Sequence, residues 1–340
     1  HHISADIAYA VWQYWQATGD EVFLRDAGAE IILETGRFWA SRALLGTDGH
    51  YHIRGVIGPD EYHEHIDDNT FTNVMARWNI RRALDVAALL AQYWPAQWAA
   101  LSSRIGADDA ERDQWRTVAE GLEVCIDVDT GLFEQFHGYF DLEDIDIADY
   151  AGRSVGMEMV LGRQRIQNTQ ILKQADVVAL LALLPEEFRP GADVANFRYY
   201  ESRCSHDSSL SPAMHGVVAA RLGDTEKALR YFRQAAAIDL SDTRVTTGGV
   251  HIAALGGLWM LAVFGFGGVS YRNDRLEIHP RLPAGWHSLA FSIQWRRRDL
   301  TVRISGNGQK VQVGLVSGEP MAIVVNGEVH YIDQGAVLSA

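Results

Sequence analysis

The chain has 340 residues, of which 47% are hydrophobic and 22% charged, a composition typical of a globular protein with one large and one small domain. Its formal net charge of -14 disfavours binding to nucleic acid and to acidic membrane surfaces. Its two cysteines lie outside any C-x-x-C spacing, which argues against a disulfide framework or a zinc ribbon.

The chain opens with His1-His2 directly ahead of an apolar pattern of helical period, without an initiator Met. We therefore expect a segment that begins inside a domain, with a two-residue tag remnant as the alternative. Between residues 4 and 266 the apolar period stays close to 3.6, and Gly, Asp and Pro separate the blocks, which predicts a mainly helical region. We place helices at residues 4–18, 22–43, 69–93, 108–124, 173–184, 208–222, 225–237 and 251–264.

After residue 268 the apolar period changes to two, and Asn307-Gly308 and Asn326-Gly327 are typical of hairpin turns. This pattern predicts a small antiparallel β-sandwich at residues 268–340, after a helical domain at residues 1–267. We interpret the helices as a toroid whose centre is lined by loops. A helical-repeat scaffold is the alternative, although the sequence shows no self-similarity of fixed period. The longest apolar run is too short to span a bilayer, so we expect a soluble, cytoplasmic protein.

The first loop with candidate chemistry is GPDEYHEH, at residues 58–65. Pro59 fixes its own φ, so Asp60 and Glu61 are presented on a turn ahead of a helix. The crowd of like charges raises the pKa of a carboxylic acid, and Glu61 or Asp60 could therefore be a general acid. One alternative is a solvated acidic turn that caps the helix. Another is a metal site on the His-Glu-His tail, although imidazoles at i, i+2 do not suit a helical zinc pair.

The second and third loops carry hydrogen-bond donors. Lys173 and Gln174, at an expected helix start beside Asp176, could hold sugar hydroxyls or an anion, and an ordinary Lys–Asp pair is the alternative. Residues 199–212 combine several serines with an Arg, a His and a helix start, which predicts an anion cradle. A plain helix N-cap is the alternative there. A Ser-His nucleophile is disfavoured because no Gly-x-Ser-x-Gly elbow is present.

The fourth loop is Thr246-Thr247-Gly248-Gly249-Val250-His251, which opens a helix. Its glycines allow close approach of the backbone to an anion, and His251 could donate to a phosphate. The loop has no Lys-Ser/Thr ending, which excludes a nucleotide P-loop. A glycine-rich turn for tight helix packing is the alternative.

Taken in order, GVIGPDEYHEHIDDNTFTN, LKQADVVALL, YYESRCSHDSSLSP and TTGGVHIAALGGLW resemble the signature loops of glycoside hydrolase family 65. The tail PRLPAGWHSLAFSIQWRRRDLTVRI resembles the small C-terminal β domain of that family. The family contains inverting phosphorylases of α-linked glucosyl disaccharides. The resemblance implies that the chain is the C-terminal part of a longer protein. We expect part of an (α/α)6 barrel, without its first helices, followed by the β-sandwich.

The resemblance also implies roles for single residues. Glu61 falls on the general acid, and Lys173 and Gln174 fall on residues that hold the transferred glucose. Gly248 stands where relatives commonly have an acidic residue. The residues that fall in the two loops around phosphate are Ser208, Ser209, Gly249 and His251.

These assignments favour phosphorolysis. An inverting hydrolase needs a second carboxylate to activate water, whereas a phosphorylase needs a pocket that aims an anionic phosphate. We predict inverting phosphorolysis of a disaccharide of the kojibiose, trehalose or maltose type to β-glucose 1-phosphate and glucose, with no metal and no organic cofactor. Glu201 or Asp207 could be the base of a hydrolase of the acid trehalase or kojibiose hydrolase type, and an inactive carbohydrate-binding toroid fragment is the other alternative. The expected partners are the disaccharide and phosphate, with a homodimer as one candidate assembly.

Overall fold

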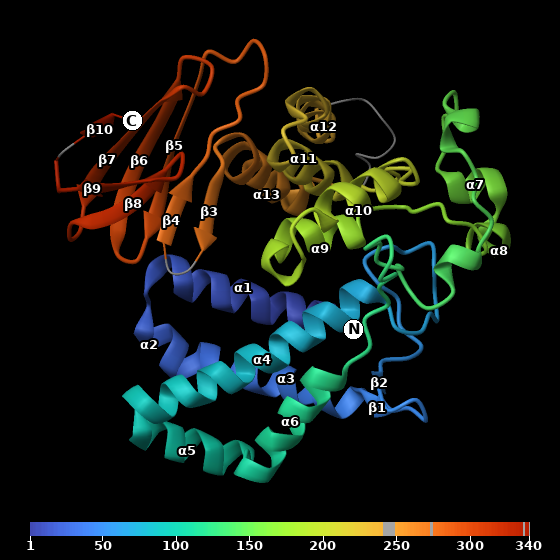
Figure 1. Ribbon diagram of the computed structural model, residues 1–340, viewed down its shortest axis with the longest axis horizontal. Coiled ribbons are helices and arrows are strands. Elements are labelled where there is room, and N and C mark those ends of the chain that lie inside the picture. The colour runs from blue at the N-terminus through green and yellow to red at the C-terminus, as the bar shows by residue number, and fades with distance from the viewer. Residues whose placement is uncertain (241–248, 273–274, 336, 340) are drawn as a thin grey trace. The chain divides into compact units, whose positions relative to one another are not determined.

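The structure is a computed structural model of the chain. It describes residues 1–240, 249–272, 275–335 and 337–339. The residues group into two compact units, His1–Glu143 and Asp144–Ala340 (Figure 1). Within the described ranges, none of the helices is both long enough and apolar enough to cross a membrane.

The first unit is built around its longest helix, α4 (Thr70–Tyr93), which packs along α3 (Ala29–Arg42) (Figure 1). The two helices approach closely because Gly36 has no side chain: a Cβ there would lie 2.7 Å from the Cβ of Ala83. Helix α4 starts at the N-cap Asn69, whose side chain accepts a hydrogen bond from the backbone N–H of Thr72. The other elements of this unit are α1 (Ile3–Thr18), α2 (Glu21–Phe23), η1 (Leu24–Gly28), β1 (Leu44–Leu45), β2 (Tyr51–His52), α5 (Pro95–Ile105), α6 (Asp109–Gly121) and η2 (Tyr139–Asp141).

Several helices of the second unit pack around α11 (Ser211–Arg221), which is buried along most of its length. Helix α13 (Ile252–Met260) approaches it at Gly257, where a Cβ would lie 2.7 Å from the Cβ of Ala213. The other helices of this unit are η3 (Ile147–Tyr150), α7 (Met157–Leu161), α8 (Arg163–Ile166), α9 (Val177–Leu183), η4 (Pro185–Glu187), α10 (Ala192–Glu201), α12 (Thr225–Ala237) and η6 (Leu261–Phe266).

The β domain follows these helices and is coloured orange to red in Figure 1. In its described residues the strands form two four-stranded sheets, of order β10-β7-β6-β5 and β3-β4-β8-β9, around one apolar core. The predicted turns at Asn307 and Asn326 are confirmed, because both residues have positive φ and are followed by glycines that also have positive φ. Pairing is antiparallel except that β4 and β8 are parallel. The strands are β3 (Val269–Arg272), β4 (Arg275–Ile278), β5 (Ser288–Trp295), β6 (Arg298–Ser305), β7 (Lys310–Ser317), β8 (Met321–Val325), β9 (Glu328–Ile332) and β10 (Val337–Ser339).

Three predicted helices, at residues 4–18, 69–93 and 225–237, end within one residue of α1, α4 and α12. Among the helices of ten residues or more, the prediction missed α5 and α10. Helix α5 buries only Leu101, and α10 buries Asn196 among its apolar residues, so neither sequence has a clear apolar stripe.

Two predicted helices start too early. Helix α9 begins at Val177 and not at residue 173, because Leu172 is paired with Cys204 in a parallel bridge and the chain bends at Lys173 and Gln174. Helix α11 begins at Ser211, with Pro212 in its first turn, and not at residue 208. Two others, at residues 22–43 and 251–264, contain the π-helical turns η1 and η6, which a period of 3.6 does not reveal.

Candidate active site

The GPDEYHEH segment, called the acid loop below (residues 58–65), is closed at its base. The backbone N–H of Val56 donates to the carbonyl of Ile66 at 2.9 Å, and the N–H of Ile66 donates back to Val56 at 3.0 Å. Between these two residues the chain turns around Asp60, which is completely buried, and presents Glu61, which is exposed. The two neighbouring carboxylates therefore have different environments, and Glu61 is the one that solvent reaches.

Asp60 anchors the acid loop. Its carboxylate accepts hydrogen bonds from His63 Nδ1 at 2.5 Å and from Gln135 Nε2 at 3.0 Å, and Gln135 is itself fully buried. The ring of His63 packs against Phe136, with 5.0 Å between the ring centroids. A simple solvated turn is therefore a wrong description of Asp60, which fixes the base of the loop that carries Glu61.

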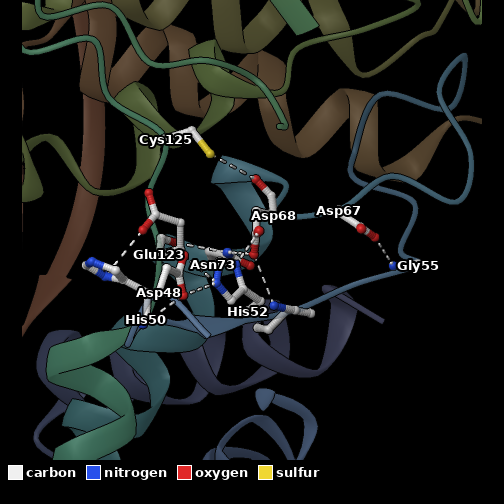
Figure 2. A network of polar contacts seen from close by, with 10 residues as sticks. Asp48, His50, His52, Gly55, Asp67, Asp68, Asn73, Glu123 and Cys125 are labelled. Atoms are coloured by element: carbon white, nitrogen blue, oxygen red, sulfur yellow. Dashed lines mark hydrogen bonds and ion pairs between the residues drawn. The ribbon is translucent and has the colours of Figure 1, made fainter. Parts of the chain in front are cut away.

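A second buried carboxylate, Asp68, follows the acid loop in sequence and lies at the centre of a network of polar contacts (Figure 2). One of its oxygens accepts from the backbone N–H of Ile53 and from Asn73 Nδ2, both at 3.1 Å, and the other meets His52 Nδ1 at 2.7 Å. Asp68 also has a φ of 51°, a left-handed conformation that Asn and Asp tolerate better than most residues. The residue therefore joins β2 and the adjoining Ile53 to helix α4.

His52 bridges two carboxylates, because its Nε2 lies 3.1 Å from Asp48 while its Nδ1 meets Asp68 (Figure 2). The hydrogen bond to Asp68, followed by that to Asp48, raises the pKa of His52 above its usual value. Next to Asp68, the carboxylate of Asp67 accepts from the backbone N–H of Gly55 at 2.9 Å. The segment around Glu61 is thus fixed by side-chain carboxylates on both sides.

In the second unit, the predicted glucose residues lie next to the predicted phosphate residues. The carbonyl of Leu172 accepts from the N–H of Ser205 at 2.8 Å, and the carbonyl of Lys173 accepts from the N–H of Asp207 at 3.0 Å. Lys173 is partly buried and Gln174 is 8% exposed. The segment around Lys173 therefore runs beside residues 202–210, called the serine loop below. The expectation that Lys173 and Gln174 begin a helix is wrong, because α9 starts later.

Ser208 and Ser209 lie in the serine loop just before α11, and both are partly buried. The Oγ of Ser208 accepts from the N–H of Leu210 at 3.3 Å, and the Ser208 carbonyl accepts from the N–H of Ser211 at 3.4 Å. The two serines thus form the turn that leads into the helix, where hydroxyls and backbone N–H groups can meet an anion.

The carboxylates near the serine loop already have partners. Asp207 lies 3.1 Å from Arg153 Nη2 and accepts the backbone N–H of Met157 at 2.8 Å. Glu201 accepts from the hydroxyl of Tyr231 at 3.0 Å and lies 2.9 Å from Lys227 Nζ. Cations and hydrogen-bond donors thus engage the carboxylate oxygens that a water-activating base would use.

His251 is held by a residue that sequence reasoning missed. Its backbone N–H and its Nδ1 both donate to the carboxylate of Asp239, at 3.0 and 2.7 Å, and this hydrogen bonding lowers the pKa of Asp239. Because Nδ1 of His251 is hydrogen-bonded to Asp239, Nε2 is the ring nitrogen that can contact a ligand. No local spacing links the two residues in sequence. Gly249 has a φ of 98°, and the preceding Thr246, Thr247 and Gly248 lie outside the described residues.

Side chains of the metal-ligating types come together in two places within the described ranges. Each group has one ligand atom per residue, all within 4.8 Å of one another. In the second unit, the hydroxyl of Ser211 lies 2.9 Å from His206 Nδ1 and 3.3 Å from the sulfur of Cys204. These two candidate ligand atoms are therefore engaged in hydrogen bonds with Ser211. The predicted alternative on the His-Glu-His tail belongs to neither group. The groups are Cys204, His206 and His215, and Cys125, Glu134 and His137.

Comparison with known proteins gives relatives over nearly the whole chain. The chain is 39% identical to a kojibiose phosphorylase of Caldanaerobacter subterraneus subsp. tengcongensis, over 96% of this chain and 43% of the relative. It is 36% identical to a 1,2-alpha-glucosylglycerol phosphorylase of Bacillus selenitireducens, over 98% of this chain and 44% of the relative. The chain thus spans about two fifths of the length of these curated relatives.

The fold has a solved counterpart. A chain named "Putative kojibiose phosphorylase from human microbiome" matches with a TM-score of 0.89 and 28% identity, over 99% of this chain and 49% of that chain. The likeness confirms the predicted fold class of a mainly helical region followed by a small, largely antiparallel β domain. The family model for the glycosyl hydrolase family 65 central catalytic domain matches residues 1–260, and the model for the family's C-terminal domain matches residues 269–331. The chain therefore belongs to glycosyl hydrolase family 65, as its four loops indicated.

Proposed function

We propose that the complete protein is an inverting phosphorylase that converts an α-linked glucosyl disaccharide and phosphate into β-glucose 1-phosphate and glucose. The names of the relatives support phosphorolysis of an α-glucoside in general. The observation that carries the choice against hydrolysis is the pairing of the two carboxylates in and beside the serine loop, Asp207 with Arg153 and Glu201 with Lys227. We further propose that residues 1–267 belong to the (α/α)6 barrel and residues 268–340 to the β domain.

In this mechanism Glu61 is the general acid. Its proton moves to the glycosidic oxygen as the bond between that oxygen and the anomeric carbon breaks, and a phosphate oxygen forms the new bond from the opposite face. A proton released by the phosphate product or by solvent then reprotonates the carboxylate of Glu61. The closed base of the acid loop and the buried anchor Asp60 limit the positions that Glu61 can adopt, which lowers the entropic cost of aligning it.

Phosphate needs no general base because it is already an anion at neutral pH, so the rest of the site has to bind and aim it. We assign this task to the hydroxyls of Ser208 and Ser209, to the backbone at Gly249 and to Nε2 of His251. A pocket of hydroxyls, N–H groups and an imidazole can bind phosphate without a metal, so the proposal includes neither a metal nor an organic cofactor. Lys173 and Gln174, beside the serine loop, are assigned to the transferred glucose.

The reaction itself is tested by incubating the full-length protein with kojibiose, trehalose, maltose or glucosylglycerol, each with and without phosphate. We expect β-glucose 1-phosphate to form from at least one of these donors, and only when phosphate is present. The configuration at the anomeric carbon of the glucose 1-phosphate, which is locked by the phosphate ester and read by proton NMR, should be β. Glucose release that does not depend on phosphate would contradict the proposal and support the hydrolase branch of the family.

The role of Glu61 is tested by Glu61→Gln, which keeps the size of the side chain and removes the proton donor. Turnover of the disaccharide should fall by about 10²-fold or more, the usual weight of general acid catalysis. Glu64→Gln is the matched control in the same loop and should leave turnover within a factor of about three. Glucosyl fluoride, whose leaving group needs no proton, should be used by both variants. A Glu61→Gln enzyme with wild-type turnover of the disaccharide would remove Glu61 from the mechanism.

A further inference from the structure

One residue of the serine loop has an unusual backbone conformation. His206 has a φ of 53°, in the left-handed region that only a few per cent of non-glycine residues occupy, Asn, Asp and His more often than the rest. Its two neighbours are fixed, because Ser205 donates to the carbonyl of Leu172 and Asp207 donates to the carbonyl of Lys173. The chain therefore turns sharply at His206, immediately before Ser208 and Ser209. Such a conformation persists where surrounding contacts hold it.

The contacts on one side of the ring fix the position of its proton. Tyr231 lies 3.0 Å from Glu201 Oε1 and 3.2 Å from His206 Nε2, and Glu201 is paired with Lys227. A tyrosine hydroxyl has a single proton, and a carboxylate can only accept. Tyr231 therefore donates to Glu201 and accepts from His206, which requires the proton of the imidazole to be on Nε2.

On the other side of the ring, Nδ1 must then act as an acceptor. Burial lowers the pKa of His206 to about 4, so the imidazole is neutral near pH 7 and Nδ1 carries a lone pair. The hydroxyl of Ser211 lies 2.9 Å from this nitrogen and donates to it, and the sulfur of Cys204 lies 3.3 Å from the same hydroxyl and can donate to it in turn. The ring of His206 also packs edge-on against His215, with 4.6 Å between centroids.

The hydrogen bonds thus run in one direction, from Cys204 through Ser211, His206 and Tyr231 to Glu201. Each group donates one proton to the next, so the bonds reinforce one another in a buried setting. The arrangement connects the serine loop to α10, α11 and α12 within the second unit. A ring held from both sides in this way can maintain the left-handed turn that precedes Ser208.

We propose that His206 is a positioning residue for phosphate, held in place by Tyr231 and Ser211 so that the serine loop presents Ser208 and Ser209 in the conformation that binds the anion. The inference rests on the proposed function. Loss of the Tyr231 hydroxyl weakens phosphate binding and leaves proton donation unaffected, because Glu61 belongs to a different loop. The hydrogen bonds from Ser205 and Asp207 to the carbonyls of Leu172 and Lys173 do not involve Tyr231. Because Lys173 is assigned to the sugar, binding of the sugar changes less than binding of phosphate.

The test uses the full-length enzyme with Tyr231→Phe, which removes one buried hydroxyl, and with His206→Asn, which tolerates the left-handed backbone but is too short to reach both partners. Tyr271→Phe, at a tyrosine of strand β3, is the matched control. The KM for phosphate should rise about tenfold in Tyr231→Phe and at least as much in His206→Asn, in line with the loss of a buried hydrogen bond. The KM for the disaccharide and kcat should stay within about threefold. Tyr271→Phe should match the wild type.

The dissociation constant for inorganic phosphate, measured by calorimetry, gives a second readout that does not depend on turnover. In Tyr231→Phe and His206→Asn this dissociation constant should rise in parallel with the KM for phosphate. Unchanged phosphate affinity in an active Tyr231→Phe enzyme would overturn the positioning role, as would equal losses for phosphate and disaccharide accompanied by a lower melting temperature. If the wild type binds phosphate but does not use it in turnover, the proposed function fails, while the calorimetric comparison of the variants still decides the role of His206.

Discussion

Replacing Asp68 with alanine removes the acceptor that three groups share: the backbone N–H of Ile53, Asn73 Nδ2 and His52 Nδ1. Each buried donor that loses its partner costs about 1 kcal/mol or more. Alanine in the left-handed conformation of residue 68, at a φ of 51°, adds about 1 kcal/mol. We therefore expect Asp68→Ala to lower the free energy of unfolding by about 4 kcal/mol. Asp68→Asn keeps the tolerance for positive φ and one acceptor oxygen, so its cost should be about 1–2 kcal/mol.

The measurement is urea unfolding of the full-length protein, followed by far-ultraviolet circular dichroism. Asp67→Ala is the matched control, because the adjacent carboxylate is less buried and accepts a hydrogen bond from the backbone N–H of Gly55 at 2.9 Å. Its cost should be about 1 kcal/mol. Equal destabilisation by the alanine variants at residues 67 and 68 would refute the reasoning, because the number of buried donors would then not determine the cost. Turnover of Asp68→Asn should remain measurable, since the acid loop keeps its base at Val56 and Ile66.

Two further predictions concern stability. Because the pKa of His52 is raised in the folded protein, protonated His52 stabilises the fold fully below its unfolded pKa of about 6.5, and this contribution is lost as the pH rises through the folded pKa. The difference in urea midpoint between the wild type and His52→Gln should therefore shrink from about pH 5.5 to about pH 8.5. A difference that grows with pH would contradict this sign, and His50→Gln is the exposed control. Gly257→Ala should destabilise by about 1–3 kcal/mol because its Cβ would lie 2.7 Å from that of Ala213, whereas Gly256→Ala, with no atom within 4 Å, should be neutral or stabilising by up to about 1 kcal/mol. Thermal unfolding of the two glycine variants compares them directly, and equal melting temperatures would argue against close packing of α11 on α13.

Some parts of the site were predictable because they depend on neighbours in sequence. The Gly-Pro pair predicts the turn that presents Glu61, and the structure has that turn with Glu61 exposed. The change of apolar period near residue 268 predicts the β domain, because alternating side chains have to face a common core. Asn-Gly pairs predict the turns at Asn307 and Asn326, because left-handed backbone conformations favour these residue types.

Other parts depend on contacts between residues that are distant in the chain. Gln135 reaches Asp60 across 75 positions, and this contact separates a buried anchor from the neighbouring exposed Glu61. Two carboxylates that are adjacent in a sequence look alike, since burial is a property of the packed fold. Asp239, which orients His251, likewise has no recognisable spacing from it.

The sequence by itself determined that helices precede a β domain and that Glu61 stands on a turn, because periodicity and turn chemistry are local properties. Only the tertiary structure decided that Lys173 lies ahead of helix α9 and beside the serine loop, since tertiary pairing of Leu172 with Cys204 outweighs a weak local helix propensity. It also decided the tautomer of His206, because the direction of a hydrogen bond is set by the whole network from Cys204 to Glu201 and by no residue alone.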